Sequence, residues 1–292
     1  MKIEAKENAG KQGTIIVASS VKPHAEISSE EAGVQLNLRE LWDYRELLYF
    51  LTLRDLKVRY KQTLMGVAWV LIQPLLTTLI FTIVFTRFVR LDTAGIPYPL
   101  FALSGLLLWL FFANAVTNCT QSLLSNTDLI TKVYFPRLLI PAASVGAGLV
   151  DLAVAFLLLI AITIYYGFPL TWNALVLPLF VGLMALLATG VGVLSSALTV
   201  KYRDLRHALP FVIQIWMFAS PVIYPASLVP SDWRLLLLLN PVAGILEGFR
   251  SALFGRRFNW SNIAIAAAIT VALLLIGVYV FRRSEDSFAD VI

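Results

Sequence analysis

Long apolar runs dominate the sequence and restrict what the chain can fold into. A helix of about 20 apolar residues crosses the ~30 Å hydrocarbon layer of a bilayer. Strands are excluded because the runs lack alternation at period two, and open sheet edges cannot face lipid. We therefore predict an all-α integral membrane protein with six transmembrane helices, at residues 64–88, 100–123, 138–166, 174–200, 208–224 and 263–281. The fifth is the shortest and is bounded by Pro210 and Pro225.

The composition supports this class. Charged residues make up only 14% of the chain, whereas 59% of its residues are hydrophobic. A soluble domain carries about 25% charged residues, so a soluble protein with a large core is excluded. The single cysteine, Cys119, and two distant histidines offer neither an internal disulfide nor a metal-ligand cluster, so we expect no metal site.

The positive charges predict the orientation of the spans. Cytoplasmic loops carry an excess of lysine and arginine. Four loops or ends on one side carry this excess, namely Arg54, Lys57, Arg59 and Lys61; Lys132 and Arg137; Lys201, Arg203 and Arg206; and Arg282 and Arg283. We therefore place both termini in the cytoplasm, and the net charge of +5 needs no nucleic-acid partner. Six arginines fall outside against the rule: Arg87, Arg90, Arg234, Arg250, Arg256 and Arg257.

The region before the first span predicts an interfacial helix. Residues 1–37 are polar, and we expect a disordered cytoplasmic segment without an assigned role. Residues 38–53 place charges on one arc of a helix and leucine, tryptophan and tyrosine on the other. This pattern favours an amphipathic helix at the cytoplasmic interface, with packing on a soluble domain as the alternative. A basic junction follows to residue 62, then a six-span domain over 63–281 and a short cytoplasmic tail over 282–292.

Two loops between spans are unusual. Residues 225–261 are too apolar for an ordinary external loop, and we predict two short helices dipping into the outer leaflet, with Glu247 and Arg250 on an exposed face. On the cytoplasmic side, "SNTDLITKVYFPRLLIP" predicts a short helix that Pro136 ends. That helix suits insertion into a groove on a partner, and a plain surface turn is an equally good interpretation.

No enzyme motif occurs in the chain. The phosphate-binding pattern GxxxxGK[ST] is absent, as are the zinc-protease and serine-hydrolase patterns. We therefore predict no catalytic residue and no nucleotide site in this chain. An integral-membrane transferase would need acidic or histidine residues clustered at a membrane face, and a secondary transporter would need internal repeats; the sequence has neither.

Five motifs carry a family resemblance: "RYKQTLMGVAWVLIQP", "LITKVYFPRLLIP", "SPVIYP", "LNPVAGILEGFRSALFG" and "FRRSEDSFADVI". Together, over residues 38–292, the chain resembles the permease subunit of ABC-2 type polysaccharide exporters. The resemblance implies a homodimeric channel with six spans per subunit, an N-terminal gate helix at 38–53, and re-entrant periplasmic helices after Pro225. It also implies two copies of a separate cytoplasmic ATPase that binds ATP and Mg, with no cofactor in this chain. The implied ATPase-coupling residues are Asn126, Asp128, Leu129, Lys132, Tyr134, Phe135 and Arg137.

The resemblance implies export of a lipid-linked polysaccharide, O-antigen first, from the cytoplasm to the periplasm across the bacterial inner membrane. The alternative is an ABC-2 exporter of a small lipid or drug. A phosphate of the cargo needs a cation near it in low dielectric, and the candidates are Arg54, Lys57, Arg59 and Lys61. As plain anchors at an anionic leaflet, each would contribute about 1 kcal/mol. Anchoring is the favoured role for any single cation, and phosphate binding is expected of at least one.

Aromatic side chains offer flat apolar faces to sugar CH groups. The candidate channel-lining residues are Trp69, Phe81, Phe85, Phe88, Trp109, Phe112, Trp216 and Tyr224, with contact to lipid as the alternative. Among them, Phe81, Phe85 and Phe88 are predicted to share one side of the first span. Asp151 lies in the middle of the third span, where an isolated charge is costly, and we expect it to accept a structural hydrogen bond from a neighbouring helix.

Overall fold

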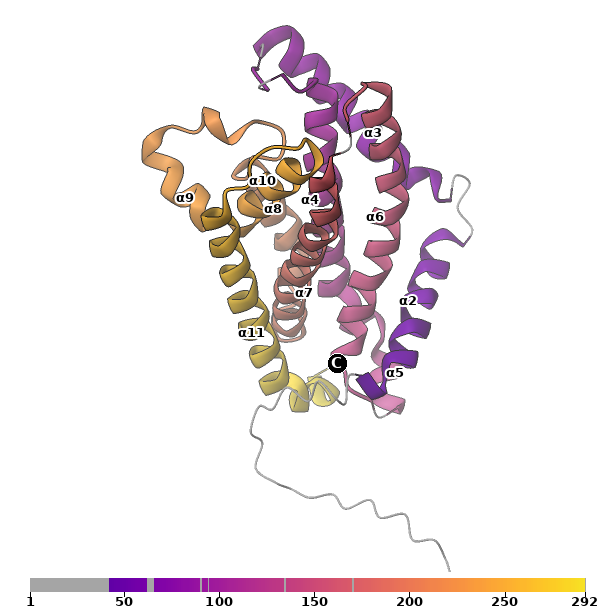
Figure 1. Ribbon diagram of the computed structural model, residues 1–292. Helices are drawn as coiled ribbons and strands as arrows, with labels where there is room; N and C mark the ends of the chain where they lie inside the picture. The colour runs from indigo at the N-terminus through magenta and orange to yellow at the C-terminus, as the bar shows by residue number, and fades with distance from the viewer. Residues whose placement is uncertain are drawn as a thin grey trace, which may run out of the picture. The chain divides into compact units, whose positions relative to one another are not determined.

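The computed structural model describes residues 42–61, 66–89, 91–93, 95–133, 135–169 and 171–291, and within these ranges it contains helices and no strand. Five helical segments are long and apolar enough to cross a membrane: Ala68–Val89, Tyr98–Ser125, Leu139–Tyr165, Trp172–Lys201 and Trp260–Glu285. They confirm the all-α membrane class and five of the predicted spans (Figure 1). The predictions for residues 1–37 lie outside the described residues.

These spans are built from α3 (Ala68–Ile83) with the π-helix η1 (Val84–Val89), α4 (Tyr98–Ser125), α6 (Leu139–Tyr165), α7 (Leu177–Lys201) preceded by the 3₁₀ turn η2 (Trp172–Val176), and α11 (Trp260–Val291). Helix α4 lies at the centre, and it packs against α6 and α7 along its length. Small residues let α7 and α11 approach closely, because a Cβ on Gly190 would lie 2.8 Å from the backbone of Leu274. By contrast, α3 packs mainly on α4, and only 11% of its span window is buried.

The predicted fifth span is shorter than expected. Its residues form α8 (Leu205–Phe218), which has 14 residues and is about 21 Å long at 1.5 Å per residue. This length falls short of the ~30 Å hydrocarbon layer. After α8 the chain turns through Ser220 and Pro221. Hydropathy alone could not show this turn, because the turning residues are themselves apolar or small.

Two short helices follow, as predicted for residues 225–261. They are α9 (Arg234–Leu239) and α10 (Pro241–Leu253), preceded by the 3₁₀ turns η3 (Ala226–Leu228) and η4 (Ser231–Trp233). The chain bends by 92° between Ser231–Leu239 and Pro241–Leu253. Their dip into the outer leaflet stays a prediction.

Asn240 stabilises the bend before α10. Its side-chain oxygen accepts from the backbone N–H of Val242 (3.1 Å) and from Nε1 of Trp216 (3.0 Å). Its amide nitrogen donates to Oγ of Ser220 (2.8 Å). Pro241 at the first helical position suits this start, because its missing N–H would have no partner there. Asn240 therefore joins the end of α8, the bend and the start of α10.

The helix before the first span extends further than predicted. Within the described residues it is α2 (Arg45–Tyr60), so it continues past residue 53 and carries Arg54, Lys57 and Arg59 on its last turns. Residues 38–41 of the predicted helix lie outside the described residues. Helix α2 packs along α6 (Figure 1), and a Cβ on Gly146 would lie 2.9 Å from Oγ1 of Thr52. Arg54, Lys57 and Arg59 are therefore part of a helix that lies against a span, and Lys61 follows its end.

The end of the chain is also helical. Helix α11 continues beyond residue 281 to Val291, where a short tail was predicted. Phe288 is buried, and its ring centroid lies 5.1 Å from that of Phe281. The same apolar cluster includes Ile130 and Phe135 from the loop between α4 and α6. Phe288, near the end of α11, therefore lies in the same apolar cluster as this loop.

Candidate functional site

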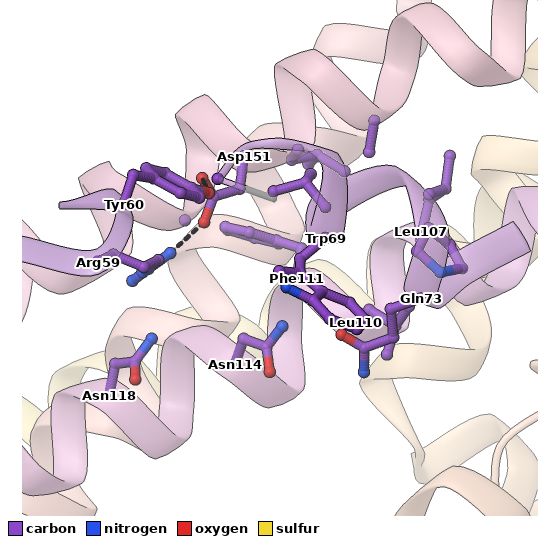
Figure 2. A pocket seen from close by; sticks show the side chains of 16 residues that line it. Arg59, Tyr60, Trp69, Gln73, Leu107, Leu110, Phe111, Asn114, Asn118 and Asp151 are labelled. Atoms are coloured by element: carbon purple, nitrogen blue, oxygen red, sulfur yellow. Dashed lines mark hydrogen bonds and ion pairs between the residues drawn. The ribbon is translucent and has the colours of Figure 1, made fainter. Parts of the chain in front are cut away.

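A cavity of about 390 Å³ lies between α3, α4 and α6, with the last turn of α2 at its edge. Figure 2 shows its labelled side chains: Arg59 and Tyr60 come from α2, Trp69 and Gln73 from α3, Asn114 and Asn118 from α4, and Asp151 from α6. Apolar side chains such as Leu107, Leu110 and Leu152 make up much of the lining, and these charged, amide and aromatic groups lie among them.

An ion pair forms one wall of the cavity. Nη1 of Arg59 donates to Oδ2 of Asp151, and the hydroxyl of Tyr60 donates to Oδ1 (Figure 2). The hydrogen bond from a neighbouring helix that was predicted for Asp151 is thus present. Because Tyr60 follows Arg59 on the last turn of α2, the two donors reach both oxygens of one carboxylate.

The ion pair lies about halfway along a span. Asp151 is the thirteenth residue of α6, so 12 steps of 1.5 Å place it about 18 Å from the start of the helix. A lone charge at such a depth is costly, and pairing reduces this cost. Removing one partner of a buried pair costs about 3–5 kcal/mol. The two side chains are 29% and 20% exposed, so the lower end of that range applies here.

Tyr60 remains a proton donor over the physiological range. Burial raises the pKa of Tyr60 to about 12, and the hydrogen bond to Asp151 adds to this rise. A neutral phenol can donate to a carboxylate, whereas a phenolate could not. Arg59 and Tyr60 together therefore form a pair of donors suited to an anion.

The wall also carries uncharged polar groups. The side-chain amides of Asn114 and Asn118 make no hydrogen bond to another described residue, and Asn114 is exposed in the chain. Trp69 is also exposed and contributes its indole ring to the cavity. An aromatic face with nearby amides can hold a sugar, because the ring contacts CH groups while the amides bind hydroxyls.

Of the four predicted phosphate-binding cations, only Arg59 lines this cavity. Arg54 instead pairs with the neighbouring Asp55 (2.8 Å). Lys57 and Lys61 are exposed, and Lys61 caps the end of α2 through its backbone N–H. The four cations therefore do not form one cluster in the described structure.

The predicted aromatic stripe on the first span holds for two of its three members. Phe81 and Phe85 lie 6.0 Å apart and pack against the core, whereas Phe88 is 79% exposed. Phe85 and Phe88 both belong to η1, whose π-helical winding has more residues per turn than an α-helix. This winding turns Phe88 away from the face that helical spacing predicts.

Two further candidates for the channel wall are buried core residues. Trp109 and Phe112 of α4 have almost no exposed surface, and the ring of Phe112 meets that of Trp216 on α8 edge-on at 5.2 Å. Nε1 of Trp216 is engaged by Asn240, and the Tyr224 hydroxyl donates to the carbonyl of Phe218 (3.0 Å). In this conformation Trp109 and Phe112 offer no face to a sugar, which corrects the prediction. Trp69 is the predicted aromatic that lines the cavity.

The short helix predicted for this cytoplasmic loop is present as α5 (Thr127–Lys132), and its role in coupling stays a prediction. Asp128 and Lys132 are exposed on it and pair at 2.8 Å, while Leu129 is half-buried. Asn126 precedes the helix without capping it, because its amide donates to the carbonyl of Ser122. Tyr134 lies outside the described residues.

Two of the predicted coupling residues instead make contacts with other parts of this chain. Phe135 is buried in the cluster beneath the loop, so it has no ring face left for a partner. The backbone N–H of Arg137 donates to Oε1 of Glu285 (3.2 Å), and its guanidinium donates to the carbonyl of the same residue. Both residues attach the loop to α11.

Arg250 is a structural residue that the sequence analysis placed wrongly. The prediction put it on an exposed face of α10 beside Glu247, yet only Glu247 is exposed on that helix. Arg250 is 7% exposed and donates to the carbonyls of Pro221 (2.6 Å) and Val222 (2.5 Å). Gly105 provides the space, because a Cβ there would collide with Nη2 of Arg250. Gly105, a glycine in the middle of an apolar span, was the one hint in the sequence that another group approaches α4 closely.

Comparison with known proteins gives consistent relatives. An O-antigen export system permease protein RfbA of Myxococcus xanthus is 30% identical over 256 residues, covering 87% of this chain and 98% of that protein. RfbA of Klebsiella pneumoniae is 28% identical over 261 residues, covering 89% and 98%. The polysialic acid transport protein KpsM of Escherichia coli is 23% identical over 239 residues, covering 81% and 93%.

The family model for ABC-2 type transporters matches residues 46–254. The match runs from α2 to the end of α10 and includes every residue that lines the cavity. The M. xanthus relative is aligned over nearly its whole length, so the similarity is not confined to single motifs. The chain is therefore a multi-span membrane protein that belongs to the ABC-2 type transporter family.

Proposed function

We propose that the chain is the membrane-spanning subunit of an ATP-driven exporter of a lipid-linked polysaccharide, with O-antigen as the first candidate cargo. It would work in the bacterial inner membrane, with both termini in the cytoplasm and as a homodimer. Two copies of a cytoplasmic ATPase would bind ATP and Mg, and this chain would hold no cofactor. The names of the relatives, which are O-antigen and polysialic acid export proteins, support this cargo class.

The chemistry of the cavity carries the proposal. A small lipid or drug can be held by a wholly apolar cavity, whereas this one adds an ion pair, an exposed indole and side-chain amides to its apolar lining. A volume of about 390 Å³ suits a polar headgroup with one or two sugar rings better than a polyprenyl tail. The lipid chain would remain outside, along the largely exposed surface of α3.

Arg59 is the candidate that would hold a phosphate within the cavity. A guanidinium can bind phosphate through two parallel hydrogen bonds. Arg54, Lys57 and Lys61 stand on or at the end of the same helix and would attract the anionic headgroup on its way in. Among these, Lys61 remains the candidate from the sequence to act with Arg59, from its exposed position at the end of α2.

The exposed part of α5 would transmit the motion of the ATPase. Asp128, Lys132 and Val133 offer a charged and apolar surface on this loop. Because the loop is attached to α11 through Phe135 and Arg137, a push on α5 would reach the span directly.

A deletion and pull-down experiment tests the cargo class. Loss of the gene should abolish surface polysaccharide, and the full chain purified with its ATPase should retain a lipid-linked glycan detectable by mass spectrometry. Normal surface polysaccharide after deletion would refute the proposal. Recovery of a small lipid without sugar would favour the exporter of small lipids or drugs.

A further inference from the structure

We propose that Asp151 is a built-in stand-in for the phosphate of the cargo. In the described conformation its carboxylate accepts hydrogen bonds from Arg59 and Tyr60. A phosphate or diphosphate group of the incoming substrate would replace the carboxylate as the acceptor. This inference rests on the proposed function, because it concerns the headgroup of a lipid-linked cargo. The ligand class is an organic phosphate or diphosphate ester, and the site is the wall of the cavity formed by Arg59, Tyr60 and Asp151.

The donors are arranged for an anion with several oxygens. The guanidinium of Arg59 and the hydroxyl of Tyr60 converge on two different oxygens of Asp151 (Figure 2). A phosphate presents oxygens at similar separations, so it can accept from the same two donors. Asp151 therefore shows where the anion would bind.

The exchange can proceed without leaving a charge alone. A guanidinium has five N–H donors, and the ion pair with Asp151 uses Nη1. A phosphate that enters the cavity can bind further N–H groups of Arg59 before the carboxylate leaves. The two side chains keep 29% and 20% of their surface exposed, so the ion pair is accessible from the cavity.

The exchange would loosen α2 from α6. Two kinds of contact hold these helices together: the close packing of Thr52 on Gly146, and the polar contacts of Arg59 and Tyr60 with Asp151. A phosphate on Arg59 removes the polar contacts at the far end of α2 and leaves the packing intact. Cargo binding would thereby release the last turn of α2, next to the start of the first span.

A purely structural ion pair would behave differently from a phosphate stand-in. If Asp151 only braces α2 against α6, its removal lowers stability and does not improve binding of an anion. If Asp151 competes with phosphate, its removal improves binding because the competitor is gone. Binding affinity and stability therefore separate the two accounts.

The experiment measures binding of undecaprenyl diphosphate to the full chain with its ATPase in nanodiscs. We expect Asp151→Asn to tighten binding at least about tenfold and Arg59→Gln to weaken it at least about tenfold, a change of about 1.4 kcal/mol each. Asp232→Asn is the matched control, because it neutralises an exposed carboxylate that does not line the cavity. Its affinity should stay within about twofold of the wild type.

The double variant Arg59→Gln with Asp151→Asn guards against loss of folding. It replaces the ion pair by two amides, so its melting temperature should lie close to that of the wild type while diphosphate binding stays lost. Inorganic pyrophosphate and undecaprenol are parallel probes: binding of pyrophosphate alone indicates a site for free phosphate, and binding of undecaprenol alone overturns the proposal.

The inference is overturned if Asp151→Asn binds the diphosphate no more tightly than the wild type, or if Asp232→Asn gains as much. Failure of the proposed function looks different, because surface polysaccharide would then survive deletion of the gene. A wild type that exports polysaccharide but gains nothing from Asp151→Asn would leave the proposed function standing and remove the exchange.

Discussion

Arg250 of α10 lies over the ring of Phe101 on α4, with its guanidinium carbon 3.7 Å from the ring centroid. No ion pair to Arg250 occurs among the residues that the structure describes. Its donors instead reach carbonyls of Phe101, Pro221 and Val222. A cation on an aromatic ring, surrounded by carbonyl oxygens, replaces the carboxylate that a buried arginine usually needs.

Replacing Arg250 should therefore destabilise the fold. Arg250→Met leaves the carbonyls of Pro221 and Val222 without these donors, and each orphaned buried acceptor costs about 1–3 kcal/mol. We expect a loss of at least about 2 kcal/mol, measured by thermal unfolding in detergent micelles. Arg257→Met is the control, because Arg257 is exposed near the same helix. Equal melting temperatures for the two variants would contradict the role given to Arg250.

Gly105→Ala should lower the stability of the fold by a similar amount, because Gly105 lies on the α4 side of the contact with Arg250. The new Cβ would collide with Nη2 of Arg250 and with the carbonyl oxygen of Val222. Overpacking of this kind costs about 1–3 kcal/mol. Gly182→Ala is the matched control, because a Cβ there meets nothing within 4 Å. In α7 it should be neutral or stabilising by up to about 1 kcal/mol. Unfolding curves in which Gly105→Ala matches this control would rule out the close approach.

The hydrogen bond from Tyr60 to Asp151 should be insensitive to pH around neutrality. The folded-state pKa of Tyr60 is raised to about 12, above the usual value of about 10. Its stabilisation is therefore fully present below pH ~10 and is lost as the pH rises through about 12. We expect Tyr60→Phe to lower the melting temperature by the same amount at pH 6 and at pH 9. A loss that disappears by pH 9 would show that the phenol ionises earlier.

Substitutions at two nearby residues after α5, Val133 and Phe135, should affect different properties of the protein. Val133 is exposed, so Val133→Asp should leave the melting temperature unchanged and reduce ATP-driven export several-fold by disturbing the surface offered to the ATPase. Phe135 is buried, so Phe135→Ala should lower stability by about 3 kcal/mol or more. Export and thermal unfolding, measured on the same preparations, separate the two. Unimpaired export by Val133→Asp would remove this surface from the coupling path.

The spans were predictable because a continuous run of apolar residues, visible in the local sequence, is what the hydrocarbon layer requires. The end of α8 was not, since its turn at Ser220 and Pro221 depends on carbonyls satisfied by Arg250, which lies far along the chain. The exposure of Phe88 also escaped prediction, because nothing in "VFTRFV" distinguishes a π-helix from an α-helix.

The two charged members of the candidate site were predictable from the sequence, and their pairing was not. The positive cluster pointed to Arg59, and the cost of a mid-span charge pointed to Asp151. Their contact joins positions 92 residues apart, and a single sequence carries no record of such a partnership. The cavity amides Asn114 and Asn118 are polar residues within an apolar run, but only the fold of α4 against α3 and α6 turns them toward a common space.

Asn240 has a mechanical consequence. Its one side chain binds the ring nitrogen of Trp216 on α8, the hydroxyl of Ser220 after α8, and the first turn of α10. Arg250 of α10 donates to carbonyls of the turn after α8, so two sets of hydrogen bonds join α10 to this turn. Because α10 also packs on α7 and α11, a displacement of the turn after α8 would be transmitted through α10 to these two spans.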